Sequence, residues 1–188
     1  MNAKFDFRAF AIALFILAVA LRLTTHAYNL AAVGALGMLV GCYWSARIGF
    51  LFSVAAMAVS DVLGHWLQIP SMGFYEPWLM LTVYGATGVA AIVGKVVGNL
   101  ERVNPKSLWV GVPAGAIVSA VLFFLVTNTA SWMDPQMGYP ATATGLISCY
   151  VAAIPFAQGT FVGNLLFSAL FFGSYKYAIS LTTSEAKA

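Results

Sequence analysis

Residues 108–127 read LWVGVPAGAIVSAVLFFLVT, a run of twenty residues without a charged side chain. The hydrocarbon core of a bilayer is about 30 Å thick and needs roughly 20 apolar residues of helix, so this run predicts a transmembrane helix. On either side of it, further apolar runs lie at about residues 10–23, 30–45, 48–64, 77–98 and 160–179. The sequence therefore predicts an all-α integral membrane protein in which six transmembrane helices form a single membrane domain over residues 1–188.

The composition supports a membrane protein and excludes a soluble one. Hydrophobic residues make up 61% of the 188 residues, charged residues make up 8%, and the mean hydropathy is +0.88. Such a chain has too little polar surface to form a soluble domain, and six spans leave no room for a soluble catalytic domain. The net charge of +3 is expected to face anionic lipid headgroups rather than nucleic acid.

The basic residues are sorted between the two sides of the membrane that the predicted spans define. One side holds Lys4, Arg8, Arg47, Lys95, Arg102, Lys106, Lys176 and Lys187, and the other holds only Arg22. Because basic residues near span ends are retained in the cytoplasm, this distribution predicts a multi-pass protein of the cytoplasmic membrane with both termini inside. Both histidines and three acidic residues, Asp61, Glu76 and Asp134, fall on the outer side. We therefore expect a binding site that opens outward.

Residues 139–158 are the least regular apolar stretch. Tyr139-Pro140 introduces a run over residues 141–156 that three hydroxyl residues and Pro155 interrupt, and the run is too short to cross the bilayer comfortably. If it crossed, the last basic residues would move to the outer side, against the charge rule. We expect a short additional helical or re-entrant segment in the last outer loop, covering a cavity as a lid or wall.

Pairs of glycines spaced four residues apart predict where helices pack closely. These pairs are Gly37 with Gly41, Gly94 with Gly98, Gly111 with Gly115 and Gly159 with Gly163. Each pair makes a groove in which a second helix backbone can approach. The grooves can serve packing within the chain or contact with a partner subunit, so the oligomeric state is left open.

Eight residues near the outer face are candidates for ligand binding. They are His26, Asn29, Asp61, His65, Trp78, Tyr84, Asn128 and Tyr139. A carboxylate at membrane depth is costly and suggests function, although a carboxylate at a helix end can simply reach water. Aromatic residues at this level either form the interfacial belt or stack on a ligand ring. Polar residues inside the spans need hydrogen-bond partners, which neighbouring helices or a ligand can supply.

Motifs of soluble enzymes are missing from the chain. It has no G-x-x-x-x-G-K-[ST], G-x-S-x-G, H-E-x-x-H or C-x-x-C, so ATP hydrolysis by a Walker site is not expected. His26, Asp61 and His65 could approach a metal geometrically, but their spacing matches no recognised metal site. We expect a protein that is not an enzyme and carries neither cofactor nor metal.

Several short strings together resemble a known family. They are His26 to Asn29, Ser60-Asp61, Val83-Tyr84-Gly85, Thr127-Asn128, Trp132, Tyr139-Pro140, Thr144-Gly145-Leu146, Cys149 to Phe156, Gly159-Thr160 and Gly163-Asn164. In combination they resemble a bacterial family of proposed transport proteins of unknown function, over about residues 20–175. That family is similar to the solitary substrate-binding S-components of energy-coupling-factor (ECF) vitamin transporters, and in particular to the cobalamin-specific type.

The resemblance implies six helices, cytoplasmic termini and an outward-facing cavity capped by loops. It also implies that a separate ATPase and transmembrane module supplies energy. The cobalamin-binding relatives present a cysteine at the start of the span that here begins Trp78-Leu79-Met80-Leu81, and this chain has no cysteine there. The predicted function is uptake of a small molecule, a vitamin or cofactor precursor, from the outer face. The alternatives are a membrane scaffold or assembly subunit and a small intramembrane enzyme.

Overall fold

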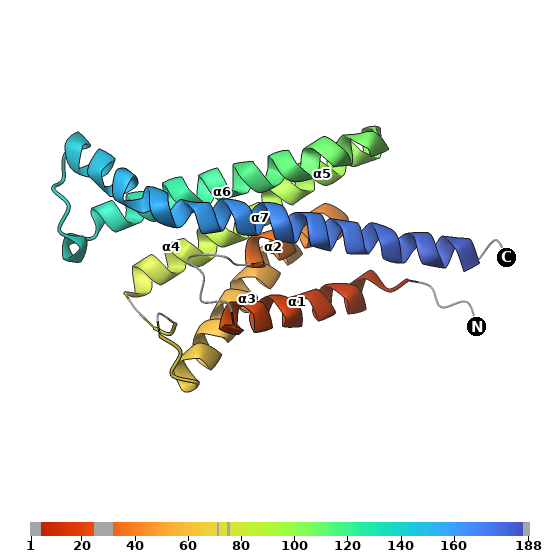
Figure 1. The fold of residues 1–188 in the computed structure, drawn as a ribbon, viewed down its shortest axis with the longest axis horizontal. Helices are drawn as coiled ribbons and strands as arrows, with labels where there is room; N and C mark the ends of the chain where they lie inside the picture. Colours follow the sequence, from red (N-terminus) through yellow and green to blue (C-terminus); the bar gives the residue numbers. More distant parts are fainter. Residues whose placement is uncertain (1–4, 25–31, 71, 75, 186–188) are drawn as a thin grey trace.

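The computed structural model describes residues 5–24, 32–70, 72–74 and 76–185 (Figure 1). Within these ranges all regular structure is helical, as the apolar runs predict. The α-helices are α1 (Phe7–Thr24), α2 (Val33–Tyr43), α3 (Ala46–Trp66), α4 (Pro77–Gly88), α5 (Ala90–Val103), α6 (Leu108–Met133) and α7 (Ala143–Glu185). Two short 3₁₀ helices, η1 (Pro105–Ser107) and η2 (Pro135–Met137), lie before and after α6.

Five helical stretches of the described chain are long and apolar enough to cross a membrane. They are α1, α3, α4 continued by α5 over Pro77–Val103, η1 with α6 over Pro105–Met133, and α7 over Ala143–Thr182. This supports the prediction of a multi-pass helical membrane protein. The span predicted at residues 30–45 is only partly found, because α2 has 11 residues and is about 16 Å long. Six full crossings are therefore not established.

α2 ends early because the chain turns at Trp44 and Ser45. The Ser45 hydroxyl accepts a hydrogen bond from the backbone amide of Ile48 at 3.1 Å and so caps the first turn of α3. The apolar run over residues 30–45 thus contains a helix, a turn and the N-cap residue of the next helix. Hydropathy alone does not separate these elements.

The separate outer segment predicted at residues 139–158 is wrong for most of its length. Residues 143–158 are the first part of α7, a single helix of 43 residues that also contains the span predicted at 160–179. The Thr142 hydroxyl accepts from the Gly145 amide at 3.1 Å at the start of this helix. Pro155 lies inside the helix without ending it, and Ser148 bonds back to the Thr144 carbonyl at 2.9 Å. At about 1.5 Å per residue, α7 is about 64 Å long.

α2 forms the centre of the molecule. Nine of its 11 residues are buried, and it contacts each of the other α-helices. Glycines allow its backbone to touch that of α5, since a Cβ at Gly94 would lie 2.0 Å from the Met38 carbonyl oxygen and one at Gly41 would lie 2.1 Å from that of Ala91. The predicted close packing at the first two glycine pairs is confirmed as packing within the chain.

The start of α1 and the end of α7 lie at the same end of the molecule (Figure 1). The junction between α5 and α6 lies at this end as well, whereas the loop between α3 and α4 and the connection between α6 and α7 lie toward the opposite end (Figure 1). The end with the termini is called the terminal end below, and the other the distal end. The predicted sorting of charge follows this division, with Arg102 and Lys106 at the terminal end and Arg22 in the last turn of α1.

Candidate functional site

A buried polar cluster joins α1, α3 and α4. Asp61, in α3, has 2% of its surface exposed. Its Oδ1 accepts a hydrogen bond from Arg22 Nη1 at 2.6 Å, and its Oδ2 accepts from the Tyr84 hydroxyl at 2.5 Å. Two of the predicted site residues, Asp61 and Tyr84, are thus brought together, and Arg22 supplies the countercharge. We call Arg22, Ser60, Asp61 and Tyr84 the ion-pair cluster.

Ser60 completes the cluster from the buried side of α3. Its hydroxyl donates to the Ala56 carbonyl at 2.7 Å and accepts from Arg22 Nη1 at 2.6 Å. Arg22 therefore bridges two adjacent residues of α3. Because both oxygens of Asp61 already accept hydrogen bonds, the cluster is suited to holding three helices together rather than to binding a ligand carboxylate or metal.

The ion-pair cluster does not include His65, which the sequence analysis considered with His26 and Asp61 as a possible metal ligand. His65 is exposed near the end of α3, and its ring lies 5.5 Å from that of Phe74 in the following loop. Trp78, near the start of α4, is 37% exposed. Among the described residues, no group of three or more His, Cys, Asp or Glu side chains is arranged to hold a metal ion. The predicted residues His26 and Asn29 lie outside the described residues.

A cavity of about 210 Å³ lies between α6 and α7. Its lining consists of aromatic, small and polar uncharged side chains. They are Phe123, Phe124, Thr127, Asn128, Ala153, Phe156, Ala157 and Thr160. Among the predicted site residues that the structure describes, Asn128 alone lines it. We call this space the α6/α7 cavity.

The polar groups of the α6/α7 cavity are fixed by bonds along α6. Thr127 donates its hydroxyl proton to the Phe123 carbonyl at 2.8 Å, and Asn128 Nδ2 donates to the Phe124 carbonyl at 2.8 Å. The bond of Thr127 uses the one donor of its hydroxyl, whereas Asn128 commits one of its two amide N–H groups. The lone pairs of Thr127 Oγ1 and Asn128 Oδ1 are the acceptors that these side chains can offer to a molecule in the cavity.

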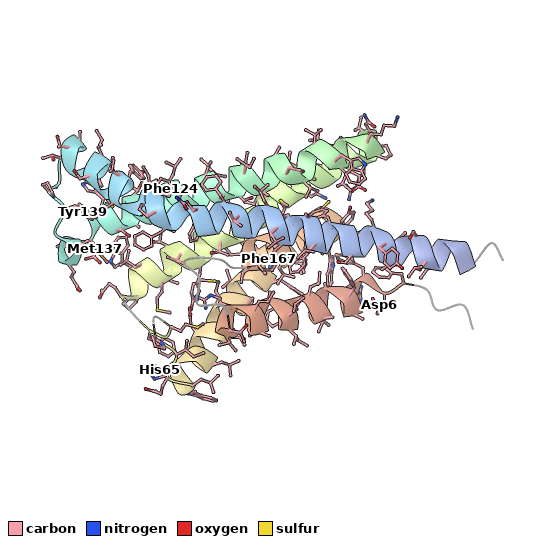
Figure 2. All side chains as sticks on the ribbon, viewed as in Figure 1. Asp6, His65, Phe124, Met137, Tyr139 and Phe167 are labelled. Carbon is pink, nitrogen blue, oxygen red and sulfur yellow. The ribbon has the colours of Figure 1, made fainter. Side chains whose placement is uncertain are left out.

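Tyr139 lies near the cavity without lining it. The Cys149 thiol donates to the backbone carbonyl of Asn128 at 3.4 Å. Near the same end, the Trp132 indole donates to the Pro140 carbonyl at 2.9 Å. These bonds hold the distal ends of α6 and α7 together. Figure 2 shows Phe124 between Tyr139 at the distal end and Phe167 in the middle of the molecule.

The terminal end of α7 is held by a different ion pair. Lys176 Nζ bonds to the Glu101 carboxylate of α5 and also lies 5.5 Å from the centre of the Tyr43 ring. Lys176 is 46% exposed and Glu101 14%. One continuous helix therefore runs from the α6/α7 cavity to an ion pair at the terminal end.

Sequence reasoning missed Arg22 and the aromatic lining of the cavity. Arg22 had a signal, because it is the one basic residue on the outer side of the predicted topology, at a depth where it needs an acidic partner. Phe123, Phe124 and Phe156 had none, since phenylalanines in an apolar run are equally typical of lipid-facing positions.

The comparisons with known proteins identify the family of this chain, and the function of that family is unknown. A family profile described as a family of unknown function, DUF6580, matches residues 3–186, so the chain belongs to that family. No curated protein and no solved structure matches the chain significantly. The similarity to ECF S-components is therefore still a prediction.

Proposed function

We propose that this DUF6580 protein is a membrane-embedded binding protein that takes up a small organic molecule, a vitamin or cofactor precursor, for transport in the manner of an ECF S-component. The observation that carries the proposal is the α6/α7 cavity, which combines three phenylalanine rings with three polar uncharged side chains. Apolar surface with a few oriented polar groups is the usual composition of a small-molecule site.

The position of the cavity supports uptake from the distal side. Its α6 lining residues lie between Phe123 and Asn128, in the half of α6 that leads to the distal end. The basic residues gather toward the terminal end, and by the charge rule that end is cytoplasmic. A ligand would then enter from outside and leave toward the termini. A separate ATPase and transmembrane module is the proposed partner for energy.

The two ion pairs connect helices that would have to move relative to one another in the proposed transport cycle. The ion-pair cluster holds α1, α3 and α4 together as one body beside the cavity. α7 carries part of the cavity wall and is tied to α5 by the pair of Lys176 and Glu101. A tilt of α7 on ligand binding would strain this tie, because α7 is continuous between the two points.

The proposal is tested by filling the cavity. Ala153→Phe places a ring in the lining, whereas Ala152→Phe adds the same ring at an adjacent exposed position. Purified protein is incubated with a library of water-soluble vitamins and precursors, and retained compounds are identified by mass spectrometry. We expect the wild type and Ala152→Phe to retain a compound that Ala153→Phe loses. Retention of no compound, or equal retention by both variants, contradicts the proposal.

A scaffold or assembly subunit is the second candidate, and the exposure of α7 favours it. Only 11% of the most apolar window of this helix is buried within the chain. A partner helix could cover the exposed face instead of lipid. In that case Ala152→Phe would release a co-purifying partner, while Ala153→Phe would keep it.

A further inference from the structure

We propose that the α6/α7 cavity selects uncharged molecules of one ring or two fused rings that present an N–H or O–H group to Thr127 and Asn128. This inference rests on the proposed function and names the class of substrate that the site takes. It follows from the charge, the hydrogen-bonding state and the size of the lining.

The first argument is charge. Among the described residues that line the cavity, none is ionisable. A charged ligand would lose its hydration at membrane depth without gaining a countercharge, which costs several kcal/mol. The two described ion pairs do not line the cavity. In each of them the basic residue already has an acidic partner, Asp61 for Arg22 and Glu101 for Lys176. The ligand that fits is therefore neutral.

The second argument is the direction of the hydrogen bonds. The Thr127 hydroxyl and the Asn128 amide nitrogen both donate to carbonyls one turn earlier in α6. Thr127 can then act toward a ligand only as an acceptor, and Asn128 keeps its carbonyl oxygen as an acceptor beside one remaining N–H. A ligand that brings only acceptors would leave these oxygens unpaired after driving water out, whereas a ligand N–H or O–H satisfies them.

The third argument is size and shape. Phe123 and Phe124 come from α6 and Phe156 from α7, so aromatic surface is contributed by both walls. Planar rings pack on such surface in offset or edge-to-face contacts. The volume of about 210 Å³ is below the roughly 300 Å³ at which sites for drug-sized ligands begin. One ring or a fused pair fits, and a corrinoid such as cobalamin does not.

The test uses four probes of nearly equal size. Benzamide is neutral and carries N–H donors, methyl benzoate is neutral without a donor, benzoate is an anion and benzylamine at neutral pH is a cation. Binding to the detergent-purified full chain is measured by calorimetry. We expect benzamide to bind and the other three to bind at least about threefold more weakly.

Variants connect the preference to the named atoms. Asn128→Leu removes one acceptor at similar volume, and Thr127→Val removes the other. Each should weaken benzamide binding about three- to tenfold while leaving methyl benzoate unchanged. Thr82→Val is the matched control, because the half-buried Thr82 of α4 makes the same hydroxyl bond to a carbonyl one turn earlier, at 2.8 Å, and does not line the cavity. It should bind benzamide like the wild type.

The outcomes separate the two levels of the proposal. Preferred binding of benzylamine or benzoate overturns the uncharged class, and equal binding of methyl benzoate overturns the need for a donor. Benzamide binding that survives Ala153→Phe reflects a site elsewhere and also overturns the inference. If the probes fail but a library compound is lost in Ala153→Phe, the substrate class is wrong and the proposed function stands. If Ala153→Phe affects the binding of no probe and the retention of no library compound, both the substrate class and the proposed function are overturned.

Discussion

Replacing Arg22 by methionine should destabilise the protein more than replacing its partner Asp61 by asparagine. The two residues form one hydrogen-bonded ion pair, but they are buried to different degrees, with 20% of the Arg22 side chain exposed and 2% of that of Asp61. Arg22→Met leaves a buried carboxylate whose described partner is the Tyr84 hydroxyl. Asp61→Asn leaves a guanidinium two residues from the end of α1, from which a long side chain can reach water.

The expected free energies differ by about a factor of two. Removing one partner of a buried ion pair typically costs about 3–5 kcal/mol, because the remaining charge is uncompensated, and we expect Arg22→Met in this range. Asp61→Asn keeps an oxygen that can still accept a hydrogen bond, so the loss is that of charge-assisted bonding, about 1.5–3 kcal/mol. The double variant should be more stable than Arg22→Met alone, because no unpaired carboxylate remains.

The assay is reversible unfolding in mixed micelles with increasing denaturing detergent, followed by circular dichroism. Arg47→Met is the control, since Arg47 is exposed in the first turn of α3 and the same substitution there should change stability by no more than about 0.5 kcal/mol. The reasoning is refuted if Asp61→Asn destabilises as much as Arg22→Met, or if the two losses simply add in the double variant.

Two further predictions concern packing and orientation. Gly94→Ala should destabilise the fold by about 1–3 kcal/mol in the same assay, because its Cβ would meet a backbone carbonyl oxygen of α2 at 2.0 Å, whereas Gly173→Ala, with no atom within 4 Å, should be neutral. A stable Gly94→Ala protein would contradict the close contact of α2 and α5. Cysteines introduced at Gln136 and Lys106 should react with an impermeant maleimide from opposite sides of the cell membrane, with Gln136 outside, because they lie at the distal and terminal ends. Labelling of both positions from one side would contradict the proposed topology.

Hydropathy located the helices but not their limits. The runs at 48–64, 77–98 and 108–127 each fall within helical stretches of the described chain. Two errors share a cause, because an apolar run carries no information about what surrounds it. Residues 30–45 contain a short central helix, and residues 143–158 belong to a long peripheral one. Burial by neighbouring helices accounts for the short α2, whereas residues 143–158 are mostly not buried and continue directly into the rest of α7.

Three of the candidate residues were chosen because a polar side chain lies inside an apolar run. Asp61, Tyr84 and Asn128 are polar side chains inside apolar runs, and each lies in the ion-pair cluster or the α6/α7 cavity. Tyr139 lies at the distal end and is not among the residues that line the cavity (Figure 2). His65 and Trp78 lie at the helix ends next to the loop between α3 and α4. Both are exposed, and neither belongs to the ion-pair cluster or the lining of the α6/α7 cavity. A loop position constrains depth but leaves the direction of the side chain open.

The burial of α2 bears on how the protein is assembled during synthesis. At about 16 Å this helix is roughly half as long as the hydrocarbon core, so the unpaired N–H and C=O groups at its ends would lie at a depth where lipid cannot satisfy them. α2 emerges from the ribosome well before α5. Gly94 and Gly98 of α5 form much of the surface on which α2 packs. It therefore has no stable place in the bilayer until the chain has been made to about Val103. We expect α2 to settle late, from the membrane surface or from within the insertion machinery, after the helices that enclose it.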